Sequence, residues 1–491
     1  MKVSKEHLIK IFSVFILLQP FIDILTSLNI RYFPTTLTVG VIVRFAFIGF
    51  IGFYLLFVYN GKQKRLVKTF FLVISLYGVI FIAHTVSVNG MSVFITNLKM
   101  FLKLFYFLYV LLLAYVLWIE FNYVVSDKII AIVCSLYAIS IFLSAITNTS
   151  FGTYDYAVGY CGWFYAGNEI GAIISILSIV AVFWAFTRKK IFYSIVFSVL
   201  IAFCSVYIGT KVPFFSVVGA IVILIFYYGV RLIIYHNRED KIIVLKAFGM
   251  FMMILLLYYG DSPIKINNNT LLTEHYQTHV EVNLQEDLVD DVSNIENSEI
   301  SESVPDMENS EISDNVSDTE DVEKLKNENV LSKQKSLEDS KLYLIANWIM
   351  SDRLYMFRDV LDTFVNSSMQ DKLFGLGYDF KIKGVRYSNL IEMDFAAIIV
   401  NQGVVGFILY LLPILCIVLY CIRCLFGRIS HFWKKPEMIV YGYACIIGFG
   451  CAAIAGHVLT APGVSIYIVI LLIKLYETMY IEKQNKKELS V

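Results

Sequence analysis

Several charged side chains lie within or beside long apolar runs, where a charge is costly unless it is paired or functional. Asp23 and Arg44 fall inside the first two runs at comparable depth, and a structural ion pair is the simplest interpretation. Lys99 and Lys103 are four residues apart, which places both on one helix face. Both lysines depart from the trend that places basic residues on the cytoplasmic side, which favours a functional role. Lysines can also extend to lipid headgroups, so both interpretations stay open.

The strongest single candidate for anion binding is Arg353, in the sequence Ser351-Asp352-Arg353. Ser351 or Asp352 can cap a helix, and apolar residues follow at helical spacing. Arg353 would then lie in the first helical turn, where free backbone N–H groups and the helix dipole favour anions. An arginine at that point adds a bidentate clamp for a phosphate. The alternative is a surface arginine on a loop helix.

Other polar side chains gather at the outer ends of the apolar runs or in the loops beside them. A histidine beside a membrane turn is more often an interface residue than a catalyst. No cluster of His, Cys, Asp and Glu has metal-ligand spacing, so we expect no metal site and no cofactor. These side chains are Asn168, Glu169, Lys211, Arg358, Asp379, Lys381, Lys383, Arg386, Glu392, Asp394 and His457.

The elements that must position these residues are membrane helices. Of the 491 residues, 58% are hydrophobic and 16% are charged, whereas soluble domains are about 45–50% apolar and about 25% charged. The apolar residues form runs long enough to span a hydrocarbon core. The fold class is therefore all-α integral membrane with about twelve helices, near residues 8–28, 37–59, 66–87, 100–119, 128–147, 168–187, 191–209, 212–235, 242–259, 401–423, 439–458 and 464–481.

Lysine and arginine clusters predict the orientation of these helices. With twelve spans, every basic cluster in a short connection falls on one side, which is the cytoplasmic side by the positive-inside rule. Both termini then lie in the cytoplasm, including a tail at residues 482–491. The chain divides into nine helices (1–259), an external segment (260–390) and three further helices (391–481).

The external segment has two parts. Residues 260–340 form an acidic insertion: from Glu274 to Glu323 there are about seventeen acidic residues and no Lys or Arg. Such a composition buries too little apolar surface to fold, so we expect disorder, either without chemistry or as an acidic tether facing the cell wall. Residues 341–390 are more apolar and predict an ordered loop that carries the Arg353 helix.

Five short motifs, taken in order, resemble the O-antigen ligase/polymerase superfamily. Two departures stand out: a lysine occupies the second motif where arginine is more usual, and many relatives have a histidine in the last. The motifs are Gly162 to Asn168 with Glu169 and Gly171, Gly209-Thr210-Lys211, Ser351-Asp352-Arg353, Phe374 to Gly377, and Glu392-Met393-Asp394 before a helix that starts at Gly403-Val-Val-Gly406.

The resemblance implies a GT-C-like architecture and transfer of glycan from an undecaprenyl-pyrophosphate-linked oligosaccharide, without a metal, at the outer face of the bacterial cytoplasmic membrane. It assigns Arg353 to the pyrophosphate and Asp394, or else Glu392, to the general base. The partners it implies are membrane lipid, a repeat-unit flippase and a chain-length regulator, with no nucleic acid. Further substrate-binding candidates are Lys211, Arg358, Lys103, Asn168, Glu169 and Arg44.

Three functions remain open at this stage. A polymerase would join lipid-linked repeat units, and a ligase would pass finished glycan to a terminal acceptor. We favour the polymerase because the Lys-, Asn- and Ile-rich composition suggests an AT-rich genome, as in many Gram-positive species that lack lipopolysaccharide. The third function is a transporter of lipid-linked oligosaccharide. Transporters usually show internal repeats and polar groups near the bilayer midplane, and this sequence shows neither clearly.

Deleting residues 274–323 separates an enzyme from a protein whose working part is the acidic segment. We expect normal surface glycan from the deletion, because a solvated insertion contributes no catalytic group. Gel analysis of surface glycan in the native host checks this. Loss of glycan with normal membrane levels of the shortened protein would assign the function to the insertion.

Overall fold

The computed structural model describes residues 5–33, 35, 37–154, 157–270, 360–382, 385–387, 391–426 and 433–489. The chain divides into two compact units, of which Met1–Asn267 with Tyr355–Val491 forms the first. The second unit, Asn268–Leu354, lies almost entirely outside the described residues. Arg353, Arg358 and the acidic insertion therefore stay predictions, as does the ordered helix expected around Arg353.

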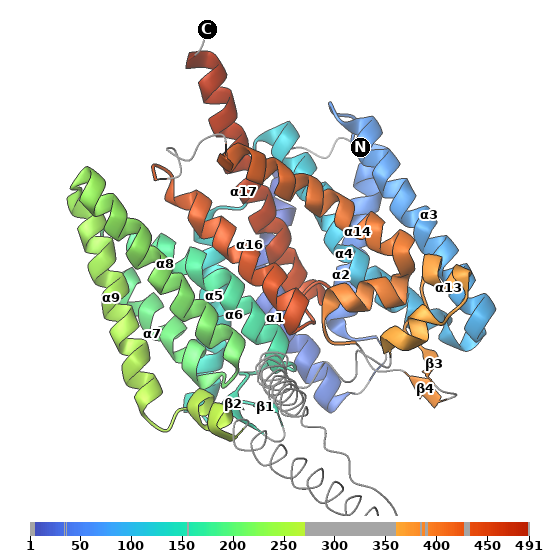
Figure 1. Ribbon diagram of the computed structural model, residues 1–491, viewed down its shortest axis with the longest axis horizontal. Helices are drawn as coiled ribbons and strands as arrows, with labels where there is room; N and C mark the ends of the chain where they lie inside the picture. The colour runs from blue at the N-terminus through green and yellow to red at the C-terminus, as the bar shows by residue number, and fades with distance from the viewer. Residues whose placement is uncertain are drawn as a thin grey trace, which may run out of the picture. The chain divides into compact units, whose positions relative to one another are not determined.

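The first unit is a bundle of membrane-length helices (Figure 1). Eleven helices among the described residues are long and apolar enough to cross a bilayer, which confirms an all-α integral membrane fold. The expected span near 191–209 is present as a shorter apolar helix of 17 residues, about 26 Å long at 1.5 Å per residue. The long helices are α1 (Lys5–Tyr32), α2 (Val39–Phe53) with its continuation Tyr54–Val58, α3 (Lys64–Asn89), α4 (Phe94–Phe121), α5 (Asp127–Ile146), α6 (Gly167–Phe186), α8 (Lys211–Tyr235), α9 (Arg238–Tyr259), α14 (Asp394–Phe426), α16 (Pro436–Ile454) and α17 (Pro462–Leu489), and the short one is α7 (Ile191–Tyr207).

Three helices form the interior of the bundle. The most apolar windows of α4, α6 and α17 are 78%, 89% and 78% buried within the protein, against 22–44% for the other spans. These three helices are apolar on nearly all sides, as expected for helices surrounded by other helices rather than by lipid on one face. The remaining spans expose large apolar side chains outward, as a lipid-facing surface requires.

Successive membrane helices, the short α7 included, alternate in direction across the bundle. In Figure 1, α1 begins and α17 ends at one end of the bundle, which we call the basic end. There Asp127, at the start of α5, lies 3.0 Å from Lys474 Nζ of α17 and accepts a hydrogen bond from Tyr441 of α16. The basic clusters of the short connections, as far as they lie among the described residues, fall at this end, as the twelve-span count predicts. Which side of the membrane it faces remains a prediction.

The opposite end, which we call the loop end, carries two small hairpins and a short helix. Strands β1 (Gly152–Tyr154) and β2 (Ala157–Tyr160) pair antiparallel between α5 and α6. Strands β3 (Phe380–Ile382) and β4 (Val385–Tyr387) pair antiparallel after the helix α13 (Met369–Phe374). Figure 1 shows both hairpins at the end away from the two termini.

Helix α14 begins at Asp394, earlier than the start predicted near residue 401. The motif expected to open the helix instead forms a kink inside it, at Gly403 with φ of 66°. The kink releases backbone carbonyls from helical hydrogen bonding. Val400 O accepts from Leu376 N at 3.0 Å, and Gln402 O accepts from the hydroxyl of Tyr77 at 2.5 Å.

The Phe374-to-Gly377 turn is therefore docked against the kink. Gly377 N donates to Asn401 O at 3.1 Å, and a side chain on Gly375 would meet that oxygen at 2.2 Å. Further contacts attach this segment to α3 and α4: His84 Nε2 lies 3.0 Å from Asp371 Oδ1, and Tyr378 N donates to Asn97 Oδ1 at 2.7 Å. These contacts attach the end of the long external segment to the bundle.

Replacing Gly403 with alanine tests this docking. A side chain there would meet Leu373 O at 2.4 Å, and the left-handed backbone costs a non-glycine residue about 1–2 kcal/mol before any clash. We expect a clearly lowered melting temperature in detergent. Gly450→Ala is the matched control, because nothing lies within 4 Å of its side-chain position in α16. Equal melting temperatures for the two variants would contradict the docked arrangement.

Candidate functional site

A charged cavity of about 380 Å³ opens among the helices at the loop end. Helices α1, α2, α4, α5 and α6 line it, together with the loop before α6 and the turn before α17. Each of these helices contributes at least one polar side chain to the lining, next to apolar ones. The polar residues of the lining are Asp23, Thr26, Thr38, Arg44, Lys99, Lys103, Tyr137, Tyr165, Glu169 and His457.

The floor of the cavity is a fully paired group of buried charges. Arg44 Nη2 lies 2.5 Å from Asp23 Oδ1, which confirms the ion pair expected from the sequence. Gln19 Oε1 accepts from Arg44 Nε at 3.1 Å and from Nη2 at 2.9 Å. The hydroxyl of Tyr137 donates to Asp23 Oδ2 at 2.6 Å. A side chain on Gly463 would meet Arg44 Nη2 at 2.9 Å, so the turn before α17 closes tightly over this pair.

The charges above the floor are not paired. Lys99, Lys103 and Glu169 make no side-chain hydrogen bond or ion pair with any described residue. Lys103 nevertheless lies close enough to Glu169, Lys99 and Arg44 for their charges to interact. The lining carries three cations, Arg44, Lys99 and Lys103, and two carboxylates, Asp23 and Glu169, so positive charge is in excess. Because unpaired charge at membrane depth is unfavourable, the arrangement favours an anionic ligand.

Asp394 is a structural anchor rather than an open carboxylate. It is fully buried and accepts four hydrogen bonds, from His457 N at 3.0 Å, Val458 N at 2.8 Å, Leu459 N at 2.6 Å and Thr460 Oγ1 at 2.8 Å. Both oxygens are thus used by the turn at residues 457–460. The general-base role predicted from the sequence finds no support in this geometry, because a base must reach the proton that it removes.

The turn that Asp394 holds carries His457 into the cavity lining. Two non-glycine residues in left-handed conformations meet here, His457 with φ of 56° and Met393 with φ of 79°. Such backbone costs of order 1–3 kcal/mol per residue and persists where surrounding contacts impose it, often at functional sites. Gly456 directly precedes His457 in this turn. A side chain at Gly456 would meet Met393 N at 2.6 Å, so the turn packs closely against the residues before α14.

The remaining predicted residues occupy nearby but different positions. Asn168, Lys211 and Glu392 are described and take part in interactions, but they are not among the residues that line the charged cavity. Lys211 opens α8 after a turn at Gly209, whose carbonyl accepts a hydrogen bond from Asn267 Nδ2 at 2.8 Å. The structure thus brings together Arg44, Lys103 and Glu169 of the predicted set.

Sequence analysis missed Gln19, Tyr137 and Tyr165 as parts of this site. Gln19 could have been found, because it precedes Asp23 by four residues and so shares its helix face. Tyr137 lies within an apolar span, and nothing local distinguishes it from the other tyrosines of the membrane helices. Tyr165 lies within the motif from Gly162 to Asn168, in which the glycines and Asn168, but not the tyrosine, were predicted to matter.

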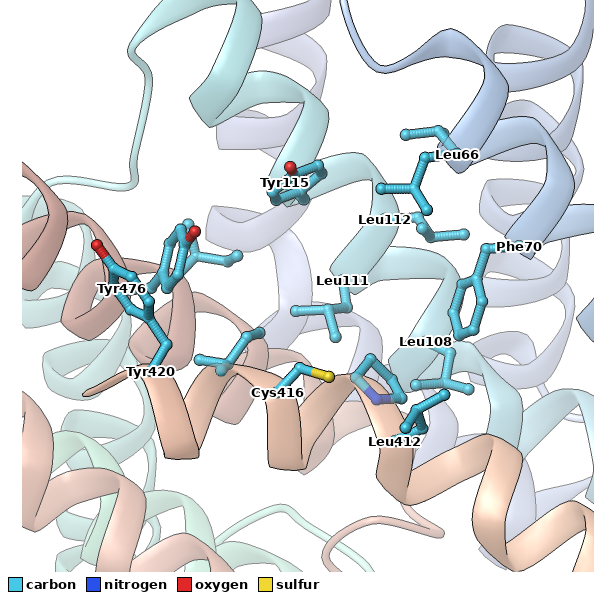
Figure 2. Close-up of a pocket in the computed structure, with 14 residues that line it drawn as sticks. Leu66, Phe70, Leu108, Leu111, Leu112, Tyr115, Leu412, Cys416, Tyr420 and Tyr476 are labelled. Carbon is cyan, nitrogen blue, oxygen red and sulfur yellow. The ribbon is translucent and has the colours of Figure 1, made fainter. Parts of the chain in front are cut away.

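A second cavity, of about 390 Å³, is apolar (Figure 2). It lies between α3, α4, α14 and α17, in the halves of these helices nearer the basic end. Figure 2 shows leucines of α3 and α4 facing Leu412 and Cys416 of α14, with tyrosine hydroxyls near one edge. Its fourteen lining residues include no charged side chain. This cavity suits a hydrocarbon chain, because nearly all of its lining side chains are apolar.

Together, the helical bundle and its charged cavity define a multi-pass membrane protein with a polar site at one end of its helices. The family model described as "O-antigen ligase like membrane protein" matches residues 5–483, and the chain belongs to this family. Membership indicates transfer of glycan at a membrane, and it does not separate a polymerase from a ligase. Searches of curated proteins and of solved structures found no match.

A double-mutant comparison tests the paired floor. Asp23→Asn should destabilise the protein by about 3–5 kcal/mol, because it leaves the charge of Arg44 buried without its partner. Adding Arg44→Gln should recover much of that loss, since no charge then remains uncompensated. Unfolding in detergent micelles measures both, with the exposed Asp261→Asn as control. Strictly additive losses in the double variant would contradict a coupled pair.

Proposed function

We propose that this protein polymerises undecaprenyl-pyrophosphate-linked oligosaccharide repeat units into a surface polysaccharide, by metal-independent glycosyl transfer at the outer face of a bacterial cytoplasmic membrane. In this proposal the loop end faces outward and both termini lie in the cytoplasm. The observation that carries it is the charged cavity, with unpaired Lys99 and Lys103 beside Arg44, in a chain of the O-antigen ligase-like family.

The cations of the cavity match the charge that develops in this reaction. An acceptor hydroxyl oxygen forms a bond to the anomeric carbon while the bond from that carbon to the pyrophosphate oxygen breaks. The leaving polyprenyl pyrophosphate keeps the bonding electron pair. Lys99 and Lys103, with no carboxylate bound to them among the described residues, supply fixed positive charge to it. Arg353 and Arg358 are proposed to add to this charge from the external segment.

The proton of the acceptor hydroxyl needs an acceptor of its own. His457 and Glu169 line the cavity and make no side-chain hydrogen bond within the described part of the chain, so both can reach a substrate. We assign His457 the role of base, because the turn that Asp394 holds carries it into the cavity lining, and a base must reach the proton that it removes. Asp394 then acts as a positioning residue that holds the turn carrying His457.

The lipid part of the donor has suitable surroundings next to this cavity. The face of α4 with Leu98 and Leu102 lines an apolar groove of about 610 Å³ shared with α3. The neighbouring positions Lys99 and Lys103 on the same helix line the charged cavity. Helix α4 thus places cations in the charged cavity and apolar side chains in the groove shared with α3. A substrate with a charged head and an isoprenoid chain requires both surroundings.

Two other functions are tested with the same variants. A ligase would share the donor and differ in the acceptor, and membership of the family is compatible with either function. A transporter would need a route across the membrane. Against it, the charges of the cavity lie near the loop end, and the interior helices α4, α6 and α17 are largely buried between the cavity and the basic end.

Replacing Lys103 with glutamine tests the proposal. We expect polymer synthesis to fall about a hundredfold, as when one preorganised electrostatic group is removed from an active site. Thermal stability should be unchanged or higher, because Lys103 has no ion-pair partner among the described residues. Lys265→Gln is the matched control: this lysine also lies at the loop end, outside the cavity lining.

Gels of lipid-linked and surface glycan from the native host distinguish the functions, with Arg353→Ala as a companion variant. Accumulated single lipid-linked repeat units support a polymerase. Long lipid-linked polymer that never reaches its final acceptor identifies a ligase. If the Lys103→Gln protein is intact in the membrane and makes normal glycan, the cavity does not take part in the reaction and the proposal is overturned.

A further inference from the structure

The loop before α6, of which residues 147–154 and 157–166 are described, forms a rim on the charged cavity and is held by internal hydrogen bonds. Phe151 N donates to Gly162 O at 2.9 Å, and Cys161 N donates to Phe151 O at 3.1 Å. Ser150 Oγ accepts from Gly162 N at 3.0 Å. The Cys161 thiol is buried in the loop and donates to nearby backbone carbonyls, and this burial raises its pKa to about 11. The loop is thus held by its own contacts before any ligand arrives.

This rim presents an aromatic ring at the cavity. Tyr165 is 55% exposed and yet belongs to the cavity lining. The guanidinium of Arg31, at the end of α1, stacks on the ring of Phe151 with its central carbon 3.6 Å from the ring centroid. The same carbon lies 5.9 Å from the centroid of Tyr165. An open ring and an oriented set of N–H donors therefore lie side by side at the rim.

We infer that this rim binds a sugar ring of the lipid-linked glycan, with Tyr165 as the stacking face and Arg31 as the donor to its hydroxyl groups. The inference rests on the proposed function, in which the pyrophosphate lies among the cations below. A sugar ring has a face of C–H groups, which carry slight positive charge, and the face of an aromatic ring carries slight negative charge. The guanidinium is planar and already held by Phe151, so it loses little freedom on binding hydroxyl groups.

Anchoring in the membrane interface is the competing role for an exposed tyrosine. Tyr259 represents that role: it is 80% exposed at the loop end of α9 and does not line the cavity. Tyr165 differs because its position is set by a rigid loop, and its ring lies beside both a cation and a cavity. A preorganised loop also lowers the entropy cost of binding.

Binding of two lipids to the full-length protein in nanodiscs tests the assignment. One probe is undecaprenyl pyrophosphate without sugar, and the other is lipid-linked oligosaccharide extracted from the native host. Tyr165→Ala should weaken binding of the glycan-bearing lipid roughly tenfold, as loss of an aromatic contact of about 1.4 kcal/mol would. It should leave binding of the sugar-free lipid unchanged. Tyr165→Phe keeps the stacking face and should behave as wild type, and so should Tyr259→Ala.

The outcomes separate this inference from the proposed function. If wild type binds both lipids and Tyr165→Ala binds them as wild type does, the sugar subsite is wrong and the proposed function stands. If Tyr165→Ala weakens both lipids equally, the residue supports the cavity rather than the sugar, and the inference is again overturned. If wild type binds neither lipid, the proposed function fails and the inference fails with it.

Discussion

The pairing of Arg44 with Asp23 inside the membrane is the constraint around which the site is built. A guanidinium at this depth is tolerated because Asp23, Gln19 and Tyr137 together satisfy the pair. Breaking a buried pair of this kind costs about 3–5 kcal/mol, so the loop ends of α1, α2 and α5 are held in one arrangement. That arrangement leaves room above the pair, and the unpaired lysines of α4 face that space.

The segment before α14 is attached to a different set of helices, α3, α4 and α14, mainly through backbone hydrogen bonds. The kink at Gly403 exposes carbonyls that accept hydrogen bonds from the Phe374-to-Gly377 turn, and Asp394 binds the turn before α17. Two turns far apart in sequence are thereby attached to one helix start. A catalytic residue on either turn is therefore fixed in position relative to the start of α14. Glycines occur at these contacts because a side chain would collide with the neighbouring backbone.

Helix number, alternation and the Asp23–Arg44 pair could be predicted from the sequence, because run length, basic clusters and charge burial are local signals. The role of Asp394 could not be predicted. Its motif places a carboxylate near the reaction, but its hydrogen bonds come from residues 457–460, more than sixty positions away along the chain. The kink at Gly403 was also missed as such, because a glycine at a helix start and one at a kink look alike in sequence.

A carboxylate that accepts four hydrogen bonds has no lone pair left for a substrate, whatever its distance from the cavity. His457 has the opposite properties: its backbone is held in an unfavourable conformation by Asp394, and its imidazole faces the cavity.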